Sequence, residues 1–74
     1  MTLKRLNEIA IRMDFIRMKF NLNDEVGELD KIEYCDELIE YSEELIEVNI
    51  NNKYFCLIQA VLHDLQSLCS DLLK

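Results

Sequence analysis

The chain has 74 residues, of which half are apolar and 31% are charged, and its formal net charge is −7. This balance predicts one small globular domain over residues 1–74 and argues against intrinsic disorder. Proline is absent and Gly27 is the only glycine, so β-hairpins and the glycine-rich phosphate loops of nucleotide enzymes are excluded and long helices are expected.

The first predicted helix covers residues 2–22, with Thr2 as its N-cap. Its core stripe recurs at helical spacing and consists of Leu3, Leu6, Ile9, Ala10, Met13, Ile16 and Phe20. A second apolar stripe lies beside it and consists of Ile11, Phe15, Met18 and Leu22. Together the stripes are wider than the apolar face of a typical surface helix, so we interpret the second stripe as a partner-binding surface. Two alternatives stay open: burial against both neighbouring helices, and a symmetric dimer contact.

The second predicted helix covers residues 26–48 and follows a break in which Asn23 or Asp24 can serve as the N-cap. It contains a seven-residue repeat, because residues 32–38 and 39–45 are identical at five of seven positions. The isoleucine, leucine, tyrosine and Cys/Ser positions of the repeat form one broad face of the helix, and the acidic positions form the opposite face.

The third predicted helix covers residues 51–73 and begins near Asn51 or Asn52. Its wide apolar face consists of Tyr54, Phe55, Leu57, Ile58, Val61, Leu62, Leu65, Leu68, Cys69, Leu72 and Leu73. Three helices with short connections predict an all-α, antiparallel (up-down-up) three-helix bundle, with dimerisation left open.

Charge divides the chain into a basic third (residues 1–22, +3), an acidic third (23–48, −10) and a neutral third (49–74). The candidate partner-binding acids of the second helix are Glu33, Glu37, Glu40, Glu44 and Glu47. A basic row of Arg5, Arg12 and Lys19, spaced by seven residues, is expected to neutralise part of this face. The acidic remainder is expected to stay exposed, where it could bind a basic protein or imitate the phosphate array of DNA.

Catalytic and metal-binding residues are sparse. His63 and Cys56 lie on the polar side of the third helix, but seven residues, or about 10 Å along a helix, separate them, which is too far for a relay or for shared metal ligation. We therefore expect no catalytic site, no metal and no cofactor. Cys35 and Cys69 are interpreted as small core residues, and Cys56 as a surface thiol that could be reactive or lie in an interface.

The sequence therefore favours a noncatalytic protein-binding module that acts through the second stripe and the acidic face. A small inhibitor or regulator of the phage or mobile-element anti-defence type is the interpretation that we favour, since the many Ile, Asn, Lys and Glu residues are typical of AT-rich coding sequence. The alternatives are a structural homodimeric subunit, an acidic DNA mimic and, last, a thiol-dependent enzyme using Cys56. We expect a soluble cytoplasmic protein that binds another protein, and neither nucleic acid directly nor a membrane, because no export signal or long apolar segment is present.

Overall fold

The computed structural model describes residues 2–22 and 27–73, with the side chain of Leu22 left out. It contains three helices, α1 (Leu3–Leu22), α2 (Glu28–Ile46) and α3 (Phe55–Leu72), and no strand within those ranges. The predicted all-α three-helix bundle is confirmed.

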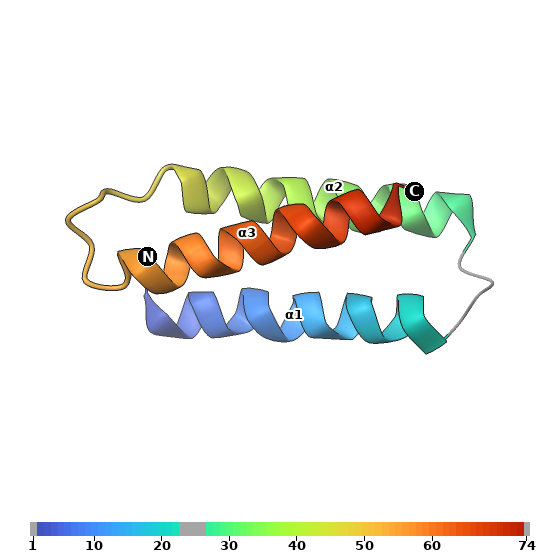
Figure 1. The fold of residues 1–74 in the computed structure, drawn as a ribbon, viewed down its shortest axis with the longest axis horizontal. Coiled ribbons are helices and arrows are strands. Elements are labelled where there is room, and N and C mark those ends of the chain that lie inside the picture. The colour runs from blue at the N-terminus through green and yellow to red at the C-terminus, as the bar shows by residue number, and fades with distance from the viewer. Residues whose placement is uncertain (1, 23–26, 74) are drawn as a thin grey trace.

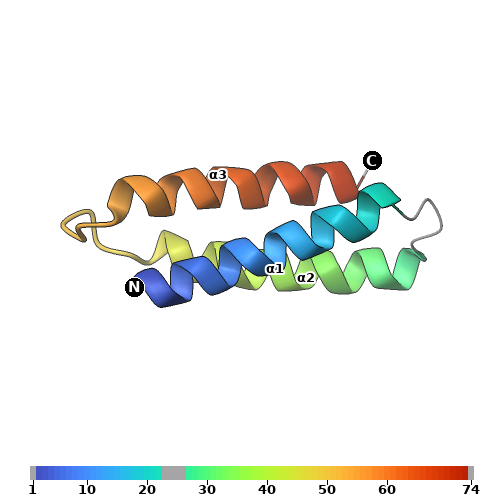
Figure 2. The same cartoon turned by 90° about the horizontal axis from the view of Figure 1, so that it is seen from below.

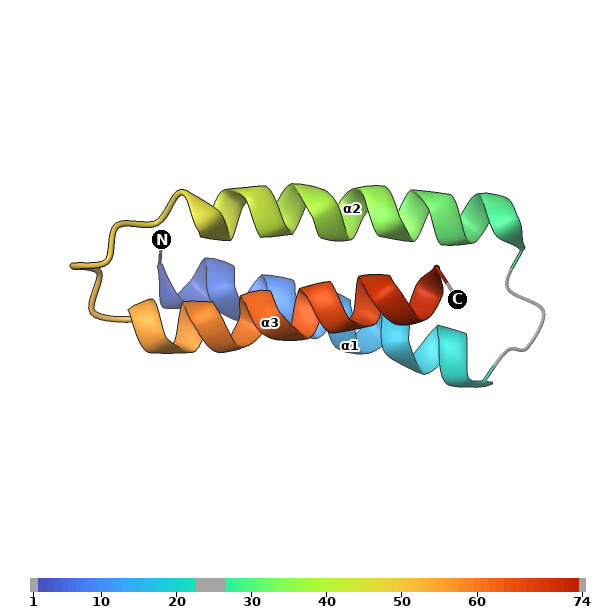
Figure 3. The same cartoon turned by 45° about the horizontal axis from the view of Figure 1, so that its top comes forward.

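The three helices lie side by side along the long axis of the molecule, which measures 42 × 17 × 15 Å (Figure 1). α1 and α3 run in the same direction and α2 returns between them in sequence, as an up-down-up bundle requires; Figure 2 and Figure 3 show the same order from other sides. The backbones of α2 and α3 approach each other more closely than α1 approaches either of them.

The start of α1 is as predicted, because the backbone N–H of Arg5 donates to Thr2 Oγ1 over 3.2 Å. The predicted caps of α2, Asn23 and Asp24, lie outside the described residues. Gly27 occupies the N-cap position of α2 and offers no side-chain acceptor. The acidic Glu28 and Asp30 in the first turn interact favourably with the helix dipole instead.

The predicted start of the third helix near residue 51 is wrong, because α3 begins at Phe55. The side-chain carbonyl of Asn49 accepts the backbone N–H of Asn51 (2.9 Å), and that of Asn52 accepts the N–H of Tyr54 (2.8 Å). Such asparagine turns compete with the helix for the same backbone donors. They turn the chain for several residues before α3 begins, and α2 also ends at Ile46, two residues earlier than predicted.

The core lies between the three helices and is made only of apolar side chains. Its buried members are Leu6, Ile9, Met13, Ile16, Cys35, Leu38, Leu45, Ile58, Leu62, Leu65, Leu68 and Leu72. The predicted core stripe of α1 is confirmed at Leu6, Ile9, Met13 and Ile16, whereas Ala10 and Phe20 are partly buried and Leu3 is exposed. No polar or charged side chain is buried among the described residues. Within the same ranges, no helix has both the length and the apolar character needed to cross a membrane.

Candidate protein-interaction surfaces

Two arginines of α1 form ion pairs with two glutamates of α2. Arg12 donates from Nε and Nη2 to the two carboxylate oxygens of Glu37 over 2.6 and 3.0 Å, and Arg5 binds Glu44 in the same forked manner over 2.9 and 2.9 Å. Tyr41 adds a third hydrogen bond to Glu37, from its hydroxyl to Oε2 over 2.7 Å. Both arginines are seven residues apart and both glutamates are seven residues apart, so two antiparallel helices bring both pairs into contact at once.

These contacts change the acidity of the groups involved. The hydrogen bonds from Arg12 and Arg5 lower the pKa of Glu37 and of Glu44 below the usual range. Burial, together with the hydrogen bond to Glu37, raises the pKa of Tyr41 to about 12. The charge matching expected between the first two helices is therefore present, and Glu37 and Glu44 are occupied within the molecule.

The other three candidate acids, Glu33, Glu40 and Glu47, point into solvent on α2 and its C-cap, together with Asp36 and Glu43. Within the described part of the chain, none of these five carboxylates forms an ion pair. We call these five residues the acidic face. Its members lie within about a quarter of the circumference of α2 by helical geometry, so they form one continuous strip of negative charge.

The second apolar stripe of α1 is exposed at the positions that the structure describes. Ile11 and Met18 are more than half exposed, Phe15 is partly exposed, and the side chain of Leu22 lies outside the described residues. Burial against both neighbouring helices is therefore wrong for Ile11 and Met18. Two cations lie near the Phe15 ring, with Arg12 Cζ 5.0 Å and Lys19 Nζ 5.3 Å from its centroid. These cation–π contacts cover part of the ring.

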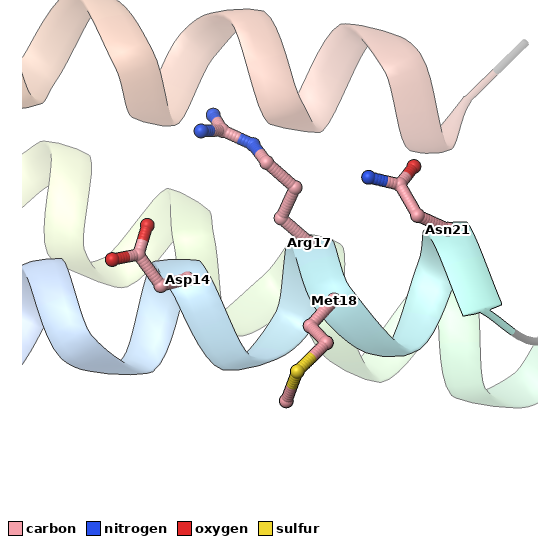
Figure 4. A pocket seen from close by; sticks show the side chains of 4 residues that line it. All are labelled: Asp14, Arg17, Met18 and Asn21. Atoms are coloured by element: carbon pink, nitrogen blue, oxygen red, sulfur yellow. The ribbon is translucent and has the colours of Figure 1, made fainter.

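A shallow depression beside this stripe is lined by Asp14, Arg17, Met18 and Asn21. Figure 4 shows Arg17 and Asn21 extending toward α3, whereas Met18 points to the opposite side of α1. All four lining residues come from α1, so no second element closes the depression. It has no enclosed volume in which a small ligand could be held.

A more regular apolar feature lies on α2 and was missed by the sequence analysis. Ile32, Ile39 and Ile46 are 58%, 47% and 62% exposed, while Leu38 and Leu45, each next to one of them, are fully buried. We call these three isoleucines the isoleucine row. The signal for it was the seven-residue repeat: adjacent helical residues point about 100° apart, so the Ile and the Leu of each Leu-Ile pair cannot both face the centre of the bundle.

The isoleucine row forms one wall of a groove between α2 and α3. Ile39 and Ile46 line it from α2, and Cys69 and Leu73 line it from the α3 side. Ser42, Glu43, Gln66 and Ser70 complete the lining. A second depression continues toward Ile32 and shares Leu73, so the groove follows the row toward the start of α2.

The residues with possible reactive or metal-binding chemistry do not come together. Cys56 and His63 are exposed on α3, as predicted. Cys35 is buried, and burial together with a hydrogen bond with Cys69 raises the pKa of its thiol to about 11, which disfavours the reactive thiolate. In residues 2–22 and 27–73, no three His, Cys, Asp or Glu side chains are close enough to hold a metal ion.

Comparisons of the chain with protein-family models, with curated proteins and with solved structures found no match. Any function proposed for this protein therefore depends on its surfaces alone.

Proposed function

We propose that this protein is a noncatalytic binding module, a small regulator or inhibitor that acts by covering part of the surface of another protein. The observation that supports the proposal is the isoleucine row, three β-branched apolar side chains spaced by seven residues and left half exposed on a fully formed helix.

The isoleucine row is more than scattered surface hydrophobicity. Its ends lie fourteen residues apart, or about 21 Å along the helix, and it borders a groove with apolar residues on both walls. Contiguous apolar patches of this kind mark interaction sites on small proteins. Burying the exposed half of an isoleucine side chain contributes about 1 kcal/mol, so the three residues together supply about 3 kcal/mol before other contacts are counted.

The second stripe of α1 is a weaker candidate for the primary contact. Its aromatic residue, Phe15, is already engaged with Arg12 and Lys19, so a partner would have to displace those cations to use the whole ring. Ile11 and Met18 stay available as additional contacts. The isoleucine row needs no such rearrangement.

The test compares two exposed isoleucines, of which one lies in the isoleucine row and the other lies outside it. Ile39→Asp interrupts the isoleucine row, whereas Ile50→Asp places the same charge on the 71% exposed Ile50 in the connection between α2 and α3. Tagged wild-type and variant proteins are used as bait in lysate of the source cells, and the recovered proteins are quantified by mass spectrometry. We expect a stoichiometric partner that is lost with Ile39→Asp and retained with Ile50→Asp.

An identical set of recovered proteins for wild type and Ile39→Asp would contradict the proposal that the isoleucine row is the binding surface. Ile11→Asp is included in the same experiment, because loss of the partner in that variant alone would move the contact to α1. Circular dichroism of each variant before use establishes that the bundle is intact.

A further inference from the structure

We propose that the groove between α2 and α3 binds an amphipathic α-helix of a partner protein, and that this helix carries lysine or arginine along the flank that lies over α2. The inference rests on the proposed function and adds to it the shape and the charge of the partner.

The spacing of the isoleucine row favours a helical partner. The isoleucines recur every seven residues, about 10.5 Å along α2, which is the spacing at which an apolar seam recurs along a facing helix. An extended strand presents side chains on one face about every 6.8 Å and falls out of step with the row. A strand would also bring unpaired backbone groups against apolar side chains, whereas a helix satisfies its own. A docked helix would lie along α2 and α3 and would form the fourth helix of a four-helix bundle.

Charge gives the partner a defined orientation. The α2 wall of the groove carries the acidic face, of which Asp36 and Glu43 are nearest to the isoleucine row by helical position. The α3 wall is uncharged where it lines the groove, with Gln66, Cys69 and Ser70. The α2 wall is therefore negative beside Ile39 and Ile46, whereas near Ile32 the charges of Glu28 and Lys31 offset each other, and the α3 wall is neutral. A helix with basic residues on one flank and polar or small residues on the other complements both walls.

A second copy of this chain does not fit the same groove. Two copies meeting through α2 would bring their acidic faces together, and like charges at an interface are unfavourable. α1 offers no basic substitute, because Arg5 and Arg12 are occupied by Glu44 and Glu37. The remaining cations of α1, Lys4, Arg17 and Lys19, exceed its two acids, Glu8 and Asp14, by a single charge, which is too little to match the five carboxylates of the acidic face. The complementary charge must come from another protein.

The test uses synthetic peptides and the whole protein. The first peptide has about three heptads, an Ile/Leu seam and lysines along one flank. The second replaces those lysines with glutamates, and the third has the composition of the first with the seam scrambled. Each carries a fluorophore, and its Kd is measured by fluorescence anisotropy at low and at high salt. The protein is used as wild type, Ile39→Asp and Glu43→Lys, with Ile50→Asp and Asp64→Lys as matched controls whose positions lie outside the groove.

We expect the lysine peptide to bind more tightly than the other two and to weaken as salt is raised. Ile39→Asp should raise the Kd of the lysine peptide about tenfold or more, because the variant removes a buried isoleucine contact and places a charge in the apolar interface. Glu43→Lys should also raise the Kd and should reduce its salt dependence. Both control variants should stay within about twofold of wild type.

Three outcomes would overturn the inference: equal binding of the lysine and glutamate peptides, equal binding of the scrambled peptide, or binding of the lysine peptide that Ile39→Asp does not change. Self-association of the wild-type protein that Ile39→Asp abolishes, seen by sedimentation, would make a second copy the occupant and would also overturn it. If no peptide binds but Ile39→Asp still loses the partner recovered from lysate, the helix inference fails and the proposed function stands. If Ile39→Asp affects neither measurement, both fail.

Discussion

The contrast between Leu38 and Ile39 gives a direct measure of which apolar residues of α2 belong to the core. Leu38 is fully buried, so Leu38→Ala removes buried methyl groups and leaves a cavity, at a cost of about 2–5 kcal/mol of unfolding free energy. Ile39 is 47% exposed. Ile39→Ala loses at most about 1 kcal/mol of burial, and the better helix propensity of alanine returns up to about half of that loss. We expect a net cost of about 0.5 kcal/mol.

The measurement is urea denaturation followed by far-UV circular dichroism. Because a chain of this size is marginally stable, every titration is made in the same concentration of sucrose, which raises the stability of wild type and variants alike. Leu45 and Ile46 repeat the contrast one heptad later, with 0% and 62% exposure, and serve as an internal replicate. Equal losses for the leucine and isoleucine variants would place the isoleucine row in the core and would refute both the groove and the proposals that depend on it.

Three further predictions concern side chains outside the isoleucine row. A double-mutant cycle with Arg12→Met and Glu37→Gln should give a coupling free energy of about 1 kcal/mol, the upper end for partly exposed pairs, because the contact is forked; a value near zero would contradict this. Since the folded-state pKa values of Glu37 and Glu44 are lowered, their contribution to stability is full above the unfolded pKa of about 4.3 and is lost as pH falls through the lower folded values. Urea denaturation between pH 7 and pH 3 should show this loss of unfolding free energy, and the loss should be smaller in the Glu37→Gln variant than in wild type. A thiol reagent at pH 8 should modify the exposed Cys56 first and Cys35 last, since Cys35 is buried and its pKa is raised to about 11; equal rates would contradict the described packing.

The sequence was sufficient to predict the three helices and the core of α1. Strong 3-4 spacing with no interrupting proline or glycine left few other structures available to residues 3–22. It was not sufficient to locate the start of α3. Asn49 and Asn52 are good helix caps and equally good turn formers, and the competition between the two roles depends on where the neighbouring helix packs.

The sequence also predicted that basic residues of α1 neutralise part of the negative charge of α2, but not through which contacts. The seven-residue spacing of Arg5 and Arg12 matches several pairs of acids on α2, and only the relative placement of the two helices selects Glu37 and Glu44. The isoleucine row was missed for a similar reason. A pattern of apolar residues gives the width of a face, whereas the positions of the neighbouring helices decide which part of that width is covered.

The seven-residue repeat of α2 has a consequence for the axial register of the bundle. Because residues 32–38 and 39–45 are nearly identical, sliding α2 by one heptad still places a leucine in one of its two buried leucine positions, but it puts Lys31 in the place of Leu38 in one direction and Asn52 in the place of Leu45 in the other. The forked ion pairs also discriminate against the slip. A slip one way matches Arg5 with Glu37 and leaves Arg12 opposite the shorter Asp30, and a slip the other way matches Arg12 with Glu44 and leaves Arg5 opposite Asn51. Each slip keeps one Arg–Glu pair and loses the other, so the ion pairs add to the buried leucines in specifying the alignment of a helix with a repetitive sequence.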